Sequence, residues 1–186
     1  MVAGEKRLPR LRRTTPSRLE DSGTERLYFA LPEPGKGTDF GNRIHRFFEK
    51  IEYLEDFVVP ADTPPEVLAH FDSCRRNPEV VELLSRQWGE PWRERTFETV
   101  VEGRWVSGCF DRVGFQYDEH GALCRAVIVD YKSNDFQLEE LPELAAHYHG
   151  QMSIYCRVLA KLLNLPAAAI GCRLLFTKWG LVQPVR

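Results

Sequence analysis

The sequence predicts an α/β domain in which a mixed β-sheet is flanked by helices, and two observations support this fold class. Apolar residues recur every three or four positions near the start of the domain and again over residues 142–163, which is the spacing of amphipathic helices. Between these regions, over about residues 96–131, β-branched and aromatic residues alternate with polar ones as they do in strands. With 186 residues, 43% of them hydrophobic, the chain is long enough for one domain with a full core.

The chain opens with a segment rich in Pro, Gly and Arg. Residues 1–36 are predicted to be a basic arm or linker ahead of a domain over residues 37–186. The arm could contact phosphates through its positive charges, or it could be a solvated terminus, and both interpretations stay open. No apolar segment follows it, so a secretory signal is not expected. No apolar run approaches the roughly 20 residues that cross a bilayer, so we expect no membrane association.

The first helix is predicted to begin at Thr38 or Asp39, either of which can cap it, and to end near Phe57. Its apolar face is formed by residues at helical spacing, namely Ile44, Phe47, Phe48, Ile51 and Leu54. Residues 64–88 are expected to form one or two shorter helices, because prolines occur in this region where helices commonly start.

Three strands are predicted next, and they are expected to form an antiparallel meander whose third strand lies in the centre of the sheet. The second and third strands, over about residues 105–117 and 123–131, are joined by a hairpin loop that contains Gly121. A long helix over residues 142–163 follows. A core strand over residues 170–177 then leads into a turn and a short last strand.

The five cysteines include no closely spaced pair, which argues against a zinc ribbon and against a disulfide framework. Several lie in apolar stretches, where a free thiol behaves as a small hydrophobic side chain. This usage indicates the reducing environment of the cytoplasm. The formal net charge of −2 does not by itself indicate a nucleic-acid-binding protein.

Two carboxylates lie in apolar surroundings on neighbouring predicted strands. Asp111 interrupts the second strand of the meander, and Asp130 ends the third. Counted from the hairpin between the strands, the two acids fall near the same level of the sheet. If their side chains share a face, they offer two oxygens to a hard cation such as Mg²⁺. The alternative for Asp111 is a simple ion pair with its neighbour Arg112 or a hydrogen bond at the strand end.

Other residues could complete such a site. Lys132 follows Asp130 by two positions, so the two side chains point to the same face of a strand. A lysine beside a metal-bound water can help to deprotonate it, orient it, or neutralise charge on a phosphate. On the first helix, His45 and Glu49 share a face, so His45 could be a further metal ligand. The alternatives are a solvent-facing lysine and an ordinary helix ion pair.

The long predicted helix carries Tyr148, Gln151 and Tyr155 on one face. An amide and two phenols can hydrogen-bond phosphates or stack on bases. The alternative is that this face packs on the sheet. No glycine-rich phosphate loop is present, so we expect no nucleotide to be bound by this domain.

The motifs follow one another in a characteristic order over about residues 37–177. They are Gly37-Thr38 with His45 and Glu49, then Gly108-x-x-Asp111-Arg112, Asp130-Tyr131-Lys132-Ser133 and Gln151-x-x-x-Tyr155. This set resembles the RecB-like branch of the PD-(D/E)XK nuclease superfamily, in particular the C-terminal nuclease domain of RecB- and AddA-type helicase–nucleases. The resemblance implies a restriction-endonuclease-like fold with a mixed central sheet flanked by helices.

The resemblance also implies roles for individual residues. The catalytic set would be Asp111, Asp130 and Lys132, and the metal ligands would be His45, Asp111, Asp130 and the backbone carbonyl of Tyr131. Support of the site and of the DNA would come from Gln151, Tyr155, Tyr148, Arg112 and Glu49. Cas4-like and AddB-like relatives carry four cysteines for an iron–sulfur cluster. Here the late cysteines are Cys156 and Cys172 only, so we expect no such cluster.

The function implied is that of a Mg²⁺- or Mn²⁺-dependent DNA exonuclease domain. Its partners would be DNA and a helicase motor, and its setting double-strand-break processing and recombinational repair at the nucleoid of the bacterial cytoplasm. Two alternatives stay open. One is a DNA-binding or scaffold domain that keeps the fold but does not cut, and the other is a free-standing RecB-like exonuclease.

Overall fold

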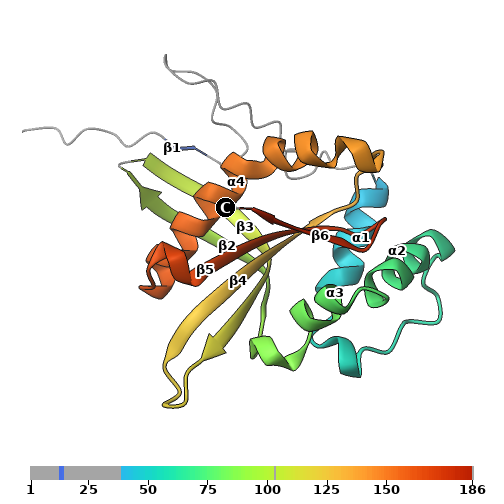
Figure 1. Ribbon diagram of the computed structural model, residues 1–186, viewed down its shortest axis with the longest axis horizontal. Coiled ribbons are helices and arrows are strands. Elements are labelled where there is room, and N and C mark those ends of the chain that lie inside the picture. Colours follow the sequence, from blue (N-terminus) through green and yellow to red (C-terminus); the bar gives the residue numbers. More distant parts are fainter. Residues whose placement is uncertain (1–12, 15–38, 103, 186) are drawn as a thin grey trace, which may run out of the picture.

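Figure 1 shows the computed structural model of the chain, which describes residues 13–14, 39–102 and 104–185. The principal elements in chain order are β1 (Arg13–Thr14), α1 (Asp39–Glu49), α2 (Pro65–Arg75), α3 (Pro78–Leu83), β2 (Trp92–Val101), β3 (Arg104–Tyr117), β4 (Leu123–Lys132), α4 (Leu141–Leu163), β5 (Ile170–Phe176) and β6 (Leu181–Val185). Short 3-10 turns at Leu54–Asp56, Arg86–Trp88, Leu138–Glu140 and Ala167–Ala169 connect several of them.

All six of these strands belong to one mixed sheet with the order β1-β3-β4-β5-β6, and β2 also pairs with β3. β2, β3 and β4 form the predicted antiparallel meander. β4 and β5 run parallel across the crossover helix α4, and β6 returns antiparallel to β5. α4 packs on one face of the sheet, and α1, α2 and α3 cover the other (Figure 1). The predicted α/β fold with a mixed sheet between helices is confirmed.

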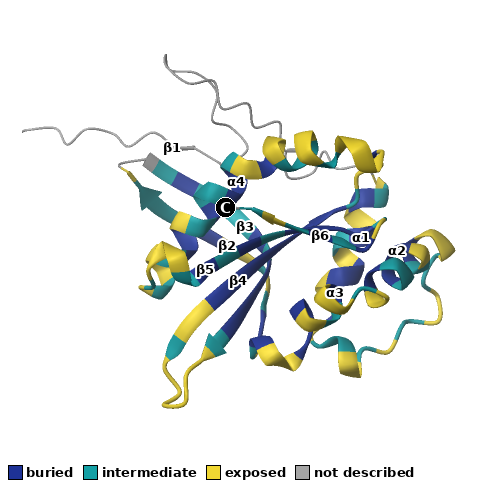
Figure 2. Ribbon diagram, in the orientation of Figure 1, coloured by how far each residue is buried: buried dark blue, intermediate teal, exposed yellow. Residues whose placement is uncertain are grey.

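β4 is buried along most of its length, which explains the continuous apolar run in its sequence (Figure 2). Ile128 lies in the core beneath α4, whereas Val129 lies in the core formed with α1, α2 and α3. Because successive side chains of a strand alternate between its faces, Asp130 and Lys132 project on the α4 side. The end of this strand therefore places two charged side chains at the edge of a hydrophobic core.

α1 ends at Glu49, so the prediction that this helix continues to near Phe57 is wrong. The reason lies in the carbonyl groups that follow the helix. Arg112 of β3 donates hydrogen bonds to the carbonyls of Ile51 and Glu52 at 2.7 and 2.8 Å. Because the buried guanidinium donates to these carbonyls, the helix can end early without leaving them unpaired in the core.

Part of the predicted arm contributes to the sheet, because Arg13–Thr14 pairs in parallel with Trp105 and Val106 of β3. The predicted boundary at residue 36 and Thr38 as an alternative helix start lie outside the described residues. Among the described helices, none is both long and apolar enough to cross a membrane.

The turn between β5 and β6 is locked against the end of α2. Gly180 has a φ of 57°, and a Cβ at this position would overlap the Ser73 carbonyl oxygen. Asn77 Nδ2 also donates to the Gly180 carbonyl at 2.8 Å.

We expect Gly180→Ala to lower the free energy of unfolding by about 3 kcal/mol in urea denaturation, through backbone strain and steric overlap. Gly121→Ala is the control, because Gly121 has a φ of 78° but no neighbouring atom within 4 Å. It should lose only about 1 kcal/mol, and equal losses would contradict the steric argument.

Candidate metal centre

The candidate site forms where β3 and β4 separate. Ladder pairing between these strands ends at Arg112 and Val129. Beyond this point the Asp111 carboxylate accepts a hydrogen bond from the backbone N–H of Tyr131 at 2.8 Å. The Asp111 side chain thus accepts the hydrogen bond that a backbone carbonyl of β3 would accept from Tyr131 if the ladder continued. Its carboxylate is tied to β4 and lies beside Asp130.

A local distortion of β2 brings a second acidic residue to the same place. Glu94 has a φ of 46°, which is unusual for a residue with a side chain. It lies opposite Asp111 in the register set by the neighbouring pair Arg95 and Phe110. β3 is irregular here as well, since Phe110 and Val113 both contribute to the core beneath α4 although an odd number of positions separates them. The regular pleat is interrupted where the two acids meet.

Three potential ligand atoms converge at this point. One atom each from His45 of α1, Glu94 of β2 and Asp111 of β3 lies within 4.8 Å of the other two. His45 Nδ1 is 3.5 Å from Asp111 Oδ2, and Cys109 Sγ donates to Glu94 Oε2 at 3.5 Å. The other oxygen, Glu94 Oε1, is buried and has no hydrogen-bond partner within the part of the chain that the structure describes. A buried oxygen without a partner is expected where a ligand binds.

The carboxylates of this site repel one another. Burial raises the pKa of Asp111 well above its ordinary value, and the negative charge of Asp130 raises it further. Burial also raises the pKa of Glu94, to which Glu49 and Asp130 add. Buried like charges of this kind are stabilised by a bound cation.

His45 is suited to metal binding. Burial lowers the pKa of His45, although Asp130 and hydrogen bonding to the backbone of Tyr131 act in the opposite direction. The neutral imidazole, which is the form that binds metals, is therefore favoured at neutral pH. One imidazole with two carboxylates is a donor set that fits Mg²⁺ or Mn²⁺.

Asp130 is directed toward α4, outside the group of three converging ligand atoms. Its Oδ2 lies 2.5 Å from Lys132 Nζ, and its Oδ1 accepts a hydrogen bond from Gln151 Nε2 at 3.2 Å. The two charged side chains are only 4% and 10% exposed. Lys132 Nζ also lies 4.1 Å from the ring centroid of Tyr148, whose hydroxyl donates to Asn134 Oδ1. The ammonium is thus held between a carboxylate and an aromatic face.

Lys132 stays protonated in this environment. Burial alone would lower the pKa of Lys132, but Asp130, Tyr148 and Asp111 raise it, and the net result is a raised pKa. A protonated lysine can donate hydrogen bonds to a water or to a phosphate oxygen and can stabilise negative charge, but it cannot accept a proton. Of the roles expected for this lysine, orientation and charge stabilisation therefore fit best.

Comparison with models of known protein families identifies the family of the chain. A model of the PD-(D/E)XK nuclease superfamily matches residues 24–185. The chain belongs to this superfamily. No curated protein matches the chain. Membership carries metal-dependent nuclease chemistry with it, and the mixed sheet between helices is the fold expected of a PD-(D/E)XK protein.

Several residues expected to support the PD-(D/E)XK site are buried in the structure. Arg112 is 1% exposed and holds the chain after α1, so it can support the site from beneath but cannot reach DNA. Tyr155 is 6% exposed and packs against the rings of Phe97 and Phe110. Glu49, by contrast, lies exposed at the end of α1. Tyr155 thus lies on the part of α4 that packs on the sheet, and its role in supporting the site stays a prediction.

Glu94 is the one residue of the converging group that the sequence reasoning missed. The predicted strand begins near Thr96, whereas β2 begins at Trp92 and therefore includes Glu94. A signal was present in the spacing. Val101 and Arg104 pair across the turn, and counting outward from them places Glu94 opposite Asp111. A predicted hairpin that extends four residues further, to Trp92, includes Glu94 opposite Asp111.

We expect Glu94→Gln to weaken Mn²⁺ binding about tenfold, because it replaces a charged oxygen of the cluster by a neutral one. The PD-(D/E)XK nuclease activity should fall by a factor of about 10 to 100 in the same variant. Calorimetric titration measures the first effect and DNA degradation the second. Glu119→Gln, on the exposed hairpin between β3 and β4, is the control and should change neither. Wild-type metal affinity in Glu94→Gln would exclude this residue from the site.

Proposed function

We propose that this protein is a Mg²⁺- or Mn²⁺-dependent DNA exonuclease domain of the RecB-like kind. The observation that carries the proposal is the convergence of His45, Glu94 and Asp111 beside the buried pair Asp130 and Lys132. Clustered carboxylates with one lysine, at the point where two strands of a sheet separate, match the needs of phosphodiester hydrolysis. They provide negative ligands for a cation and one positive group for the phosphate.

The residues of the proposed site have different roles. Asp111, Glu94, His45 and the Tyr131 carbonyl would hold the ion, with Asp130 beside them. When bound, a divalent ion activates a water and neutralises charge on the leaving oxygen. Lys132 donates to the attacking water or to a phosphate oxygen, and Asp130 fixes the position of its ammonium group. Gln151 holds Asp130 in turn.

The RecB-like assignment is supported by the order of motifs and by one contact that joins two of them. Gln151 of the Gln151-x-x-x-Tyr155 motif donates to Asp130 of the Asp130-Tyr131-Lys132 motif. The wider context is proposed from the resemblance alone. It comprises a helicase motor as partner, break processing and recombinational repair as the process, and the bacterial cytoplasm as the location.

A cutting domain fits the electrostatics better than a non-cutting scaffold of the same fold. Burial and the charges of neighbouring acids raise the pKa values of Asp111 and Glu94, so their charges destabilise the metal-free protein. A scaffold has no use for such an arrangement, because neutral side chains at these positions would pack more stably. Functional sites commonly retain groups that lower stability.

The test compares degradation of linear and circular DNA by the purified chain in Mg²⁺, in Mn²⁺ and in EDTA. We expect linear DNA to be degraded with either metal, circular DNA to resist, and EDTA to abolish the activity. A preparation that carries Asp111→Asn controls for a contaminating nuclease. Cleavage of circular DNA would exclude the exonuclease class, and equal activity with and without metal would overturn the proposal.

A further inference from the structure

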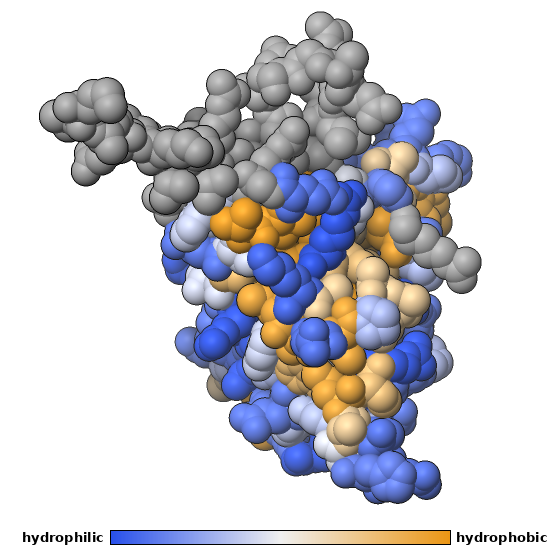
Figure 3. All heavy atoms as spheres, turned by 90° about the vertical axis from the view of Figure 1, so that its left-hand side faces the viewer, coloured by the Kyte–Doolittle hydropathy of each residue, from blue (hydrophilic) through white to orange (hydrophobic). Residues whose placement is uncertain are grey.

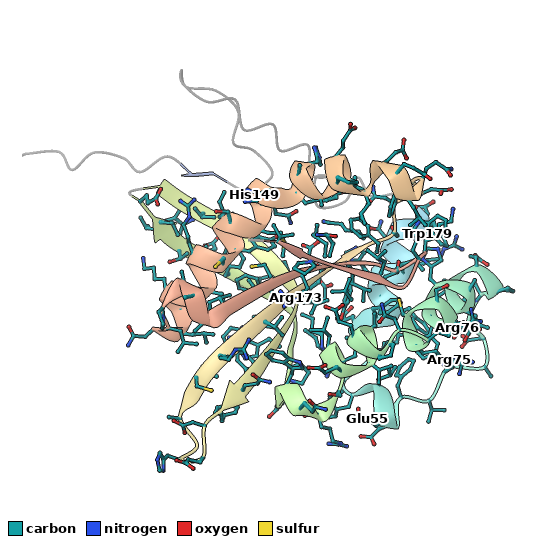
Figure 4. The ribbon with its side chains drawn as sticks, in the orientation of Figure 1. Glu55, Arg75, Arg76, His149, Arg173 and Trp179 are labelled. Atoms are coloured by element: carbon teal, nitrogen blue, oxygen red, sulfur yellow. The ribbon has the colours of Figure 1, made fainter. Side chains whose placement is uncertain are left out.

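An exposed aromatic residue, Trp179, lies beside the loop that follows Lys132. Trp179 is 40% exposed in the turn between β5 and β6 (Figure 4). Apolar side chains also reach the surface on the left-hand side of Figure 1, which faces the viewer in Figure 3, but such areas are a normal part of protein surfaces. Trp179 differs because of its place, its neighbours and the rigidity of its turn.

The place of Trp179 is the same edge of the sheet as the candidate site. β4 and β5 are parallel, with Lys132 opposite Phe176. Thr177 then donates to the Lys132 carbonyl through both its N–H and its hydroxyl, at 2.9 and 3.2 Å. The carboxyl ends of both strands therefore leave the sheet together, and Trp179 follows two residues after Thr177.

The neighbours of Trp179 are a buried ring and a cation. Its ring centroid lies 6.1 Å from that of Phe136, which is 6% exposed. Lys178 Nζ lies 5.6 Å from the Trp179 ring centroid and pairs with Asp135. The indole thus packs edge-on against a buried ring, and the Lys178 ammonium lies over the indole ring.

The turn that carries Trp179 is held in place by α2 and α3. Gly180 is bonded by Asn77 and packs directly on Ser73, as described above. Cys74 Sγ also donates to the Thr177 carbonyl at 3.5 Å. An aromatic ring fixed in this way loses little conformational freedom when a planar group stacks on it. Arg76, exposed just after α2, adds another positive charge on this side of the molecule (Figure 4).

We propose that Trp179 is a stacking platform for a base of single-stranded DNA that enters the site, with Lys178 beside the adjacent phosphate. A base offers its face to a protein only when it is unpaired, so the platform selects single strands over duplex. The inference rests on the proposed nuclease function, since it names the form of DNA that the same site receives. It assigns to the turn between β5 and β6 a role in substrate choice.

The experiment measures the anisotropy of a labelled oligothymidine and of a labelled blunt duplex in EDTA, where no cleavage occurs. Trp179→Ala should weaken binding of the single strand about tenfold and leave duplex binding unchanged, and Trp179→Phe should weaken it less. Tyr117→Ala is the matched control, because Tyr117 is 56% exposed at the opposite, hairpin end of β3. It should bind as wild type does.

Unchanged affinity of Trp179→Ala for the single strand would overturn the inference, and so would an equal loss for both forms of DNA. Unchanged duplex binding by Trp179→Ala would show that this variant is folded, so a loss confined to the single strand cannot come from unfolding. Because binding is measured without metal, this outcome is separate from the proposed function. That function fails instead if the wild-type chain does not degrade DNA in Mg²⁺.

Discussion

Replacing Asp111 with asparagine should reduce metal-dependent DNA degradation about a thousandfold, because the proposed metal site loses a charged ligand. The substitution changes the shape of the side chain very little. The asparagine oxygen can still accept the hydrogen bond from the Tyr131 N–H, which Asp111 receives at 2.8 Å. The fold should therefore survive, and the lost activity would report the chemistry.

The same substitution should make the metal-free protein more stable. Burial and the charge of Asp130 raise the pKa of Asp111 in the folded state well above its ordinary value. The folded protein therefore holds this proton at a pH where the unfolded chain has released it, and stability falls as pH rises through that interval. Asparagine removes the effect. Its gain in melting temperature should be small near about pH 4, the ordinary pKa of aspartate, and larger near about pH 8.

Thermal unfolding in EDTA at both pH values measures this difference, and added Mn²⁺ supplies the control. The wild type should gain stability from Mn²⁺ by binding it in the folded state, whereas Asp111→Asn should gain much less. Asp111→Asn should therefore melt at the higher temperature in EDTA, and the wild type should melt at the higher temperature in Mn²⁺. A wild-type response to Mn²⁺ in Asp111→Asn, together with wild-type cleavage, would remove Asp111 from the metal site.

Much of the fold could be predicted because single segments carry strong local signals. The apolar run before Asp130 predicted a buried strand, and β4 is buried on both faces. The helical spacing of apolar residues after Pro142 predicted α4 to within one residue at its start. Both signals depend on periodicity within a segment, which the sequence displays directly. The order of the motifs then indicated which strand ends meet.

Other features depend on contacts between distant segments, and these could not be predicted. The early end of α1 depends on Arg112, a residue some sixty positions later, which binds the carbonyls of Ile51 and Glu52. The kink at Glu94 depends on the partner strand. The alternation of side chains places Asp130 on the α4 side of the strand, but its hydrogen bond with Gln151 joins two segments that are 21 positions apart.

Removal of Lys132 should also reduce activity about a thousandfold, and its effect on stability should depend on whether Asp130 is still charged. Lys132→Met leaves the Asp130 carboxylate buried without its cation, which should cost about 3 kcal/mol of stability. Asp130→Asn alone leaves the ammonium without its carboxylate and should also destabilise. The double variant has no unpaired charge, so it should recover most of the stability lost in either single variant.

Urea denaturation of the four proteins measures this coupling, and DNA degradation is assayed on the same samples. We expect a coupling energy of about 2–3 kcal/mol between the two residues, with all three variants reduced about a thousandfold in activity. Arg157→Met is the control, because its ion pair with Glu102 is largely exposed and should contribute less than about 1 kcal/mol. Additive losses would show that the pair is not coupled. Recovery of stability without recovery of cleavage would separate the two roles of Lys132, because only the chemistry needs a positive charge at this position.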